Sequence, residues 1–332
     1  MAFWSYGENG SWRETRQPRG YRKNRPGSGS RGGRRSRRTP HNQGWIRFAL
    51  GSLFGIAFLG GASGTAYVVY DDLHSLKPDK IGCYATSNPQ DVTVALVDSS
   101  EPRFDTVQSR DLLNAFEDVY RRDLTFNEKF SVIVTDPSRI GTVPDPVIEL
   151  CGSASSSAEL EEIGANGATQ AYLDRQQDKI FEDRVGPTLE EVFSTDAQPG
   201  RIQNVESPIM EQIQSVSRLR NFSGNAGERT LILVSDLIQA TREVQFCTTK
   251  GHLPSFTKFK TRAYFDQVRP RSLAGVDVKI YMLVRPGLGE EPLQYCTERE
   301  LVDFWQAYFK NAQAASVEII RLRDGAYVQS GQ

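Results

Sequence analysis

The residues best suited to chemistry are acids and hydroxyls that directly follow short apolar runs. Val92–Val97 is a β-branched, nearly continuous apolar run, typical of a strand buried on both faces, and Asp98, Ser99 and Ser100 end it. In an open α/β sheet, ligands bind at the carboxyl ends of central strands, where carboxylate and hydroxyl oxygens suit a hard divalent cation. The alternative role is structural, with Asp98 or Ser100 capping the next helix.

Imidazole, thiolate and nucleotide chemistry have little support. The chain has three histidines, too few for a His-rich zinc site and a poor basis for a Ser-His-Asp triad. No P-loop or GxGxxG sequence occurs within residues 91–325. The four cysteines lack CxxC spacing, and their even number fits disulfides in an oxidising compartment, with buried free thiols as the alternative. The histidines are His41, His74 and His252, and the cysteines are Cys83, Cys151, Cys247 and Cys296.

Charge divides the chain into a basic arm and an acidic remainder. Residues 1–47 carry 12 Lys and Arg against two Glu, a net charge of +10, so the other residues carry −11 within the total of −1. Gly, Pro, Ser and Arg dominate residues 1–44, which predicts a disordered arm. Arginines mixed with aromatic residues could bind RNA or anionic lipids, and the simplest role is to hold the amino terminus in the cytoplasm.

A membrane anchor is predicted over residues 45–72. Phe48–Tyr70 is 23 residues without a charge, enough to cross the ~30 Å hydrocarbon core as a helix. The positive charge before this run places the amino terminus in the cytoplasm and the remainder of the chain outside. A cleaved signal peptide is the rival interpretation, and the long arm and long apolar run count against it.

Small residues within the anchor could support pairing of two helices. Gly51 and Gly55, and likewise Gly60 and Gly64, have the GxxxG spacing that lets helix backbones approach closely. The sequence therefore predicts a possible homodimer through the membrane helix, which Gly55→Leu and Gly60→Leu should weaken in a membrane two-hybrid assay.

After a connector at 73–90, residues 91–325 alternate between strand and helix patterns, followed by a tail at 326–332. This alternation predicts an α/β fold with a mostly parallel sheet and helices on both faces. The predicted strands are 92–97, 130–135, 147–151, 230–234, 276–284 and 317–322. The predicted helices are 107–122, 168–193 with a break near Gly186-Pro187, 209–219 and 301–312.

The order of these elements resembles the von Willebrand factor A (vWA) domain over roughly residues 91–323. In that family, a metal-ion-dependent adhesion site has a first loop Asp-x-Ser-x-Ser, then a Thr often followed by Pro, then an Asp after the fourth strand. Here the first loop keeps Asp98 and Ser100, but Pro102 occupies its final hydroxyl position. Ser207, followed by Pro208, matches the Thr position, and Asp236 matches the last acid.

The resemblance implies a magnesium site made of Asp98, Ser100, Ser207 and Asp236, with an open position for a partner's carboxylate. Asp98 and Asp236 could instead cap helices or bind backbone amides. The resemblance also implies disulfides Cys247–Cys296, at the edge of the sheet that carries the site, and Cys83–Cys151, at the opposite edge.

Together these features predict a single-pass protein of the bacterial inner membrane with a periplasmic, Rossmann-like vWA domain. Its expected role is a protein-interaction or scaffold component of an envelope assembly, without catalytic residues. One alternative is a metal-assisted hydrolase that uses Asp98, Asp236 and His252 as general base, although a single histidine is more often a surface residue. Another is a nucleic-acid tether through the basic arm.

Overall fold

The computed structural model divides into two compact units, residues 1–75 and 76–332. The first unit is described at residues 4–7 and 11–14, as backbone only. The second unit is described at 76–85, 88–100, 104–165, 167–194, 206–220, 222, 227–247, 253–283 and 296–322.

The first unit contains a two-stranded antiparallel sheet. Strands β1 (Trp4–Gly7) and β2 (Ser11–Glu14) pair with Trp4 opposite Glu14. They lie in the segment 1–44, for which the composition predicts no regular structure. The intervening sequence contains Asn9-Gly10, a strong hairpin-turn signal, and the strands are rich in aromatic residues, so local propensity favours pairing here.

The predicted membrane segment, including Gly51, Gly55, Gly60 and Gly64, lies outside the described residues. Within the described part of the chain, none of the helices has both the length and the hydropathy needed to cross a bilayer.

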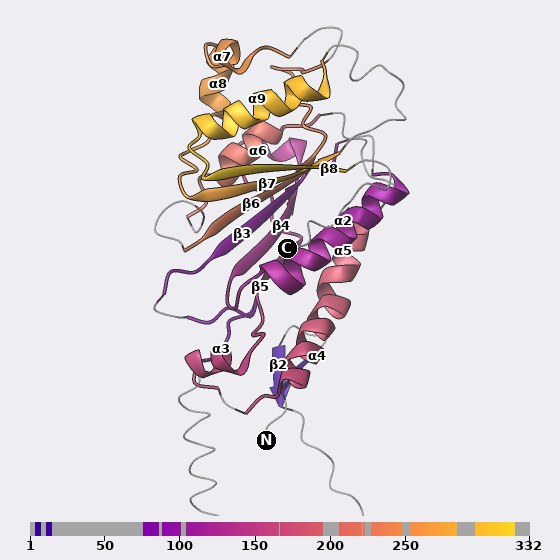
Figure 1. Cartoon of the computed structure of the whole chain (residues 1–332), viewed down its shortest axis with the longest axis vertical. Helices are drawn as coiled ribbons and strands as arrows, with labels where there is room; N and C mark the ends of the chain where they lie inside the picture. The colour runs from indigo at the N-terminus through magenta and orange to yellow at the C-terminus, as the bar shows by residue number, and fades with distance from the viewer. Residues whose placement is uncertain are drawn as a thin grey trace, which may run out of the picture. The chain divides into compact units, whose positions relative to one another are not determined.

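The second unit is built on a six-stranded sheet in the order β5-β4-β3-β6-β7-β8 (Figure 1). All pairs are parallel except β4–β5, so the predicted mixed α/β fold with a mostly parallel sheet is confirmed. All six predicted strands form, and each bound differs from the predicted one by at most one residue. They are β3 (Val92–Val97), β4 (Lys129–Val134), β5 (Ile148–Cys151), β6 (Arg229–Ser235), β7 (Val276–Leu283) and β8 (Ser316–Leu322).

Strand β3 is the centre of this sheet, with β4 and β6 bonded to it in parallel register. Val94 lies opposite Ser131 of β4 and Leu231 of β6. All six residues of β3 are buried, because helices cover both faces. Its alternating side chains enter two apolar clusters: Val94 belongs to one and Ala95 to the other.

Helices cover both faces of the sheet (Figure 1). One cluster packs α6, α7, α8 and α9 against the sheet, and the other packs α2 and α5. The first set is α6 (Ile209–Val216), α7 (Phe256–Phe259), α8 (Ala263–Val268) and α9 (Glu298–Asn311). The remaining helical elements are α2 (Thr106–Asp118), η1 (Val119–Asp123), η2 (Pro137–Arg139), α3 (Ser157–Glu162), α4 (Gln170–Ile180), η3 (Phe181–Val185) and α5 (Gly186–Val192).

The predicted break near Gly186-Pro187 is wrong, because α4, η3 and α5 run on continuously from Gln170 to Val192. The segment η3 is a π turn, and the Gly186 N–H bonds to Phe181 O, five residues back. Pro187 has no N–H to donate, and the wider turn ahead of it accommodates the ring without ending the helix.

Candidate functional site

The candidate site forms where β3 ends and the chain order reverses within the sheet. β3 connects forward to β4 on one side, whereas β6 lies on its other side, so the carboxyl end of β3 is a topological switch point. The Asp98 N–H still bonds to Val234 O of β6 at 2.8 Å. The Asp98 carboxylate therefore lies at the edge of the sheet where the parallel strands β3, β4 and β6 end.

Asp98 accepts four hydrogen bonds from four separate parts of the chain. Its Oδ2 accepts from Ser207 Oγ at 2.8 Å and Ser235 Oγ at 3.0 Å. Its Oδ1 accepts from Ser100 N at 3.0 Å and Thr135 Oγ1 at 3.4 Å. The side chain is 1% exposed. A carboxylate has about four lone-pair positions, so these donors saturate Asp98.

The loop after β3 is bonded to the end of β4 by a second set of bonds. Ser99 N donates to Thr135 Oγ1 at 3.0 Å, and Ser99 Oγ donates to Thr135 O at 2.9 Å. Ser100 is buried beside them. Thr135 is a site residue that the sequence reasoning missed, although it is a hydroxyl at the end of a predicted strand and carries the same signal as Ser99.

Ser207 lies beside Asp98 because two backbone hydrogen bonds hold Ser207 against the segment after β6. Ser207 N donates to Ala240 O at 2.7 Å, and Ala240 N donates to Ser207 O at 3.0 Å. This bridge fixes the start of α6 against the carboxyl end of β6. The hydroxyl of Ser207 is thus held over the Asp98 carboxylate by backbone bonds.

Asp236 lies at the same edge, next to Ser235, and its Oδ1 accepts from Ile238 N at 3.0 Å. This bond closes an Asx turn and matches the backbone-binding role that the sequence left open for this acid. Leu237, between Asp236 and Ile238, has a left-handed backbone conformation (φ 67°) and a buried side chain. Its carbonyl oxygen accepts a hydrogen bond from Trp305 Nε1 at 2.9 Å.

A second buried polar cluster joins the first turn of α6 to Gln239 and to Tyr264 of α8. The sequence did not predict this cluster. Gln239 Nε2 donates to Glu211 Oε2 at 2.8 Å and to Tyr264 Oη at 3.0 Å, while Gln239 Oε1 accepts from Met210 N at 3.0 Å. The Tyr264 hydroxyl donates to Glu211 Oε1. Burial, reinforced by the Glu211 charge, raises the pKa of Tyr264, so the phenol keeps the proton that it donates. The cluster fixes the first turn of α6, where an acid is stabilised by the helix dipole.

The four predicted ligands therefore lie at one edge of the sheet, and two of them, Ser100 and Ser207, bond directly to Asp98. Their oxygens are chemically suited to a hard cation such as Mg²⁺. Among the described residues, no group of three or more His, Cys, Asp or Glu could hold a metal ion. His252 lies outside the described residues.

Both predicted disulfides, Cys83–Cys151 and Cys247–Cys296, are present. Cys247 and Cys296 lie in the segments that follow β6 and β7. Cys151 lies opposite Lys129, the first residue of β4, so the Cys83–Cys151 disulfide is at the amino edge of the sheet.

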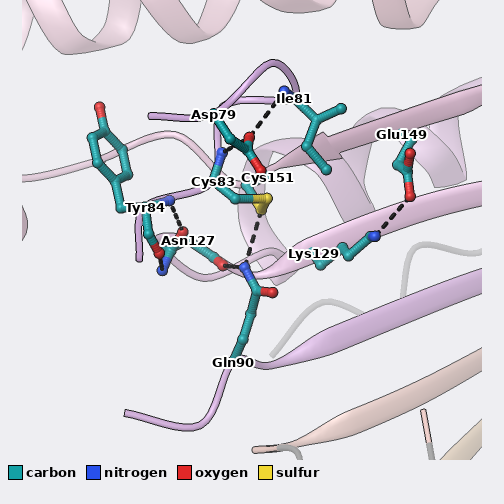
Figure 2. Close-up of a disulfide and its surroundings, with 9 residues drawn as sticks. All are labelled: Asp79, Ile81, Cys83, Tyr84, Gln90, Asn127, Lys129, Glu149 and Cys151. Atoms are coloured by element: carbon teal, nitrogen blue, oxygen red, sulfur yellow. Dashed lines mark hydrogen bonds and ion pairs between the residues drawn. A yellow bond between two sulfur atoms is a disulfide. The ribbon is translucent and has the colours of Figure 1, made fainter. Parts of the chain in front are cut away.

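Figure 2 shows how the connector is attached at that amino edge. Asn127 exchanges two hydrogen bonds with the Tyr84 backbone, at 2.7 and 3.0 Å. Gln90 Nε2 donates to Asn127 O at 2.9 Å and to Cys151 Sγ at 3.3 Å. The disulfide and these bonds hold the connector at Cys83 and at two later positions, Tyr84 and Gln90.

Comparison with known proteins yields no family assignment: no family model matches the chain, and no curated protein matches it significantly. Among solved structures, an aerotolerance-related membrane protein from Bacteroides fragilis NCTC 9343, carrying multiple mutations to serines, is 13% identical with a TM-score of 0.31; the match covers 71% of this chain and 92% of that one. The pilus adhesin SpaC from Lactobacillus rhamnosus GG, in an open conformation, is 11% identical with a TM-score of 0.35, covering 74% of this chain and 29% of the adhesin. Similarities this low carry no argument about function, and the fold rests on the strand order alone.

Proposed function

We propose that residues 91–325 form a vWA-like interaction domain that binds another protein at the carboxyl edge of its sheet. The observation that carries this proposal is the convergence of Asp98, Ser100 and Ser207, with Asp236 beside Ser235, at the topological switch point. The strand order, with one antiparallel edge strand, agrees with the resemblance noted from the sequence. A buried hydroxyl–carboxylate cluster without a nucleophile–base pair favours binding over catalysis.

Exposed apolar side chains beside this edge support a protein partner. The loop between β4 and β5 carries Ile140 and Val147, which are 48% and 46% exposed. Val147 N bonds to Val132 O near the carboxyl end of β4, and Gln212 Nε2 of α6 bonds to Arg139 O at 3.4 Å. These bonds attach the loop to the edge that carries Asp98, so the two apolar side chains border the proposed binding surface.

Magnesium is part of the proposal as a bridging ion. Ser100, Ser207 and Asp236 would hold it, with Asp98 orienting Ser207, and it would supply a positive charge for a partner's carboxylate. Mg²⁺ keeps several waters and needs few protein ligands, so the loss of the hydroxyl at Pro102 still leaves a usable donor set.

The proposed setting is the periplasmic side of a bacterial inner membrane. The uncharged run Phe48–Tyr70 and the basic residues before it support this orientation. The two disulfides support an oxidising compartment for the folded unit.

Site-specific photo-crosslinking in intact membranes tests the proposal. A photoreactive amino acid at Ile140 or Val147 should trap a partner identifiable by mass spectrometry, and chelation of Mg²⁺ should reduce the yield. The matched control is Tyr172 of α4, which is 42% exposed but distant in the fold from the switch point, and it should trap nothing that depends on Mg²⁺. Equal Mg²⁺-dependent crosslinking from all three positions, or no crosslinking from Ile140 and Val147, would contradict the proposal.

A further inference from the structure

The helices on the two faces of the sheet carry opposite charge. Residues 218–220 and 253–275, around the ends of α6, α7 and α8, contain seven Lys and Arg and one acid, a net charge of +6. Residues 155–194, which include α3, α4 and α5, contain nine acids and three Lys and Arg, a net charge of −6. The first group is called the basic surface below, and the second the acidic surface.

The basic surface is exposed and lacks acidic partners. All seven of its Lys and Arg side chains are exposed, and none forms an ion pair with a carboxylate in the described part of the chain. Arg271 N donates to Ser217 Oγ at 2.8 Å, which brings the end of α6 beside the segment after α8. The α8 helix of six residues is only about 9 Å long, so charges at its two ends act as one patch. The residues are Arg218, Arg220, Lys258, Lys260, Arg262, Arg269 and Arg271.

The acidic surface includes carboxylates that also lack a cationic partner. The exposed side chains Glu161, Glu162, Glu182, Asp183 and Glu190 form no ion pair among the described residues. Val185 and Leu189 of the same helical run pack into the cluster on the far side of the sheet from α7 and α8. In Figure 1, α7 and α8 lie at one end of this unit, and α3 and α4 lie at the other. The two surfaces therefore cannot neutralise each other within one molecule.

We propose that the basic surface of one copy of this chain docks against the acidic surface of a second copy, giving a head-to-tail contact. The two surfaces have equal and opposite net charge, which favours this partner. An anionic bilayer or nucleic acid fits less well, because the chain after residue 47 is acidic overall, at −11. Because the contact joins two different surfaces, a dimer still has one basic and one acidic surface free. Further copies can therefore add, giving a ring or an open chain. This inference is independent of the proposed function at the Asp98 edge.

Neutralising one surface at a time in the full-length protein tests the contact. The base-neutral variant carries Lys258→Gln, Arg262→Gln and Arg269→Gln, and the acid-neutral variant carries Glu161→Gln, Glu162→Gln and Asp183→Asn. In detergent at about 50 mM salt, where charges interact over longer distances, the wild type should sediment as a series of oligomers and dissociate at about 500 mM. Each variant alone should weaken association at least tenfold.

The mixture of the two variants gives the decisive result. A base-neutral copy retains the acidic surface and an acid-neutral copy retains the basic surface, so an equimolar mixture should form 1:1 dimers and stop there. The control Arg110→Glu, Arg242→Glu and Arg299→Glu changes bases elsewhere, whose side chains are 65%, 90% and 90% exposed, and should oligomerise like the wild type. Salt-independent sedimentation of the wild type, a mixture without dimers, or binding to phosphatidylglycerol vesicles by a chain that stays monomeric would overturn the proposal.

Discussion

The hydroxyl of Ser207 donates a 2.8 Å hydrogen bond to Oδ2 of Asp98, although 109 positions separate the two residues. The bond joins the residue after the central strand to the residue two positions before α6. With Ser235 and Thr135 on the same carboxylate, it ties the carboxyl ends of β3, β4 and β6 into one cluster. The contact that fixes the direction of the Ser207 hydroxyl therefore also stabilises the fold.

Asp98→Asn should lower the free energy of unfolding by about 2–4 kcal/mol, because an amide N–H₂ replaces one saturated oxygen and faces buried donors. Chemical denaturation measures the loss. Asp145→Asn is the control, since that side chain is 91% exposed and loses only a surface ion pair with Arg139 at 3.0 Å, which water screens. Equal effects of the two substitutions would mean that the four bonds to Asp98 contribute nothing.

Magnesium should raise the melting temperature of the wild type, because a ligand that binds only the folded state stabilises it. At ten times the dissociation constant the gain is about 1.4 kcal/mol, or about 3–5 °C for a domain of this size. Asp236→Ala should abolish the rise, and it is a sharper probe than Asp98→Ala, which also breaks the buried cluster. Asp266→Ala, at an exposed acid of α8, should keep it. An identical melting temperature in Mg²⁺ and in chelator would show that the site binds no ion.

The sequence predicts the sheet well and the site only in part, and the difference has a physical cause. Strands buried on both faces, such as Val92–Val97, leave a continuous β-branched run that is visible locally. Helices α7 and α8 have four and six residues, too few for a helical period to show. Thr135 and Ser235 were not predicted as partners of Asp98, because only the folded sheet determines which of many hydroxyls face one carboxylate.

Alkaline pH should destabilise the folded unit through its buried tyrosines. Burial raises the pKa of Tyr120 to about 12 and also raises that of Tyr308. The folded state thus holds these protons more tightly than the unfolded chain, whose tyrosines titrate near 10. The stabilisation is fully present below pH 10 and falls as the pH rises from 10 to 12, by up to about 3 kcal/mol for Tyr120.

The measurement for this alkaline effect is the free energy of unfolding as a function of pH between 9 and 12. Tyr120→Phe keeps the buried ring, removes the titrating group and should flatten the decline. Tyr172→Phe, at an exposed ring, should leave the decline unchanged. A decline of equal steepness in all three proteins would assign it to other groups.

Reduction of either disulfide should destabilise the folded unit. Cys83–Cys151 closes 68 positions and Cys247–Cys296 closes 49, and the chain-entropy relation gives about 4 kcal/mol for loops of these lengths. Cys83→Ser with Cys151→Ser should also loosen the connector, since the covalent link from Cys83 to β5 is then lost, and amide exchange at the neighbouring Tyr84 should accelerate. Cys247→Ser with Cys296→Ser should lower the melting temperature by a similar amount and leave exchange at Tyr84 unchanged. If both pairs accelerate exchange at Tyr84 equally, the first disulfide has no specific role in holding the connector to the amino edge.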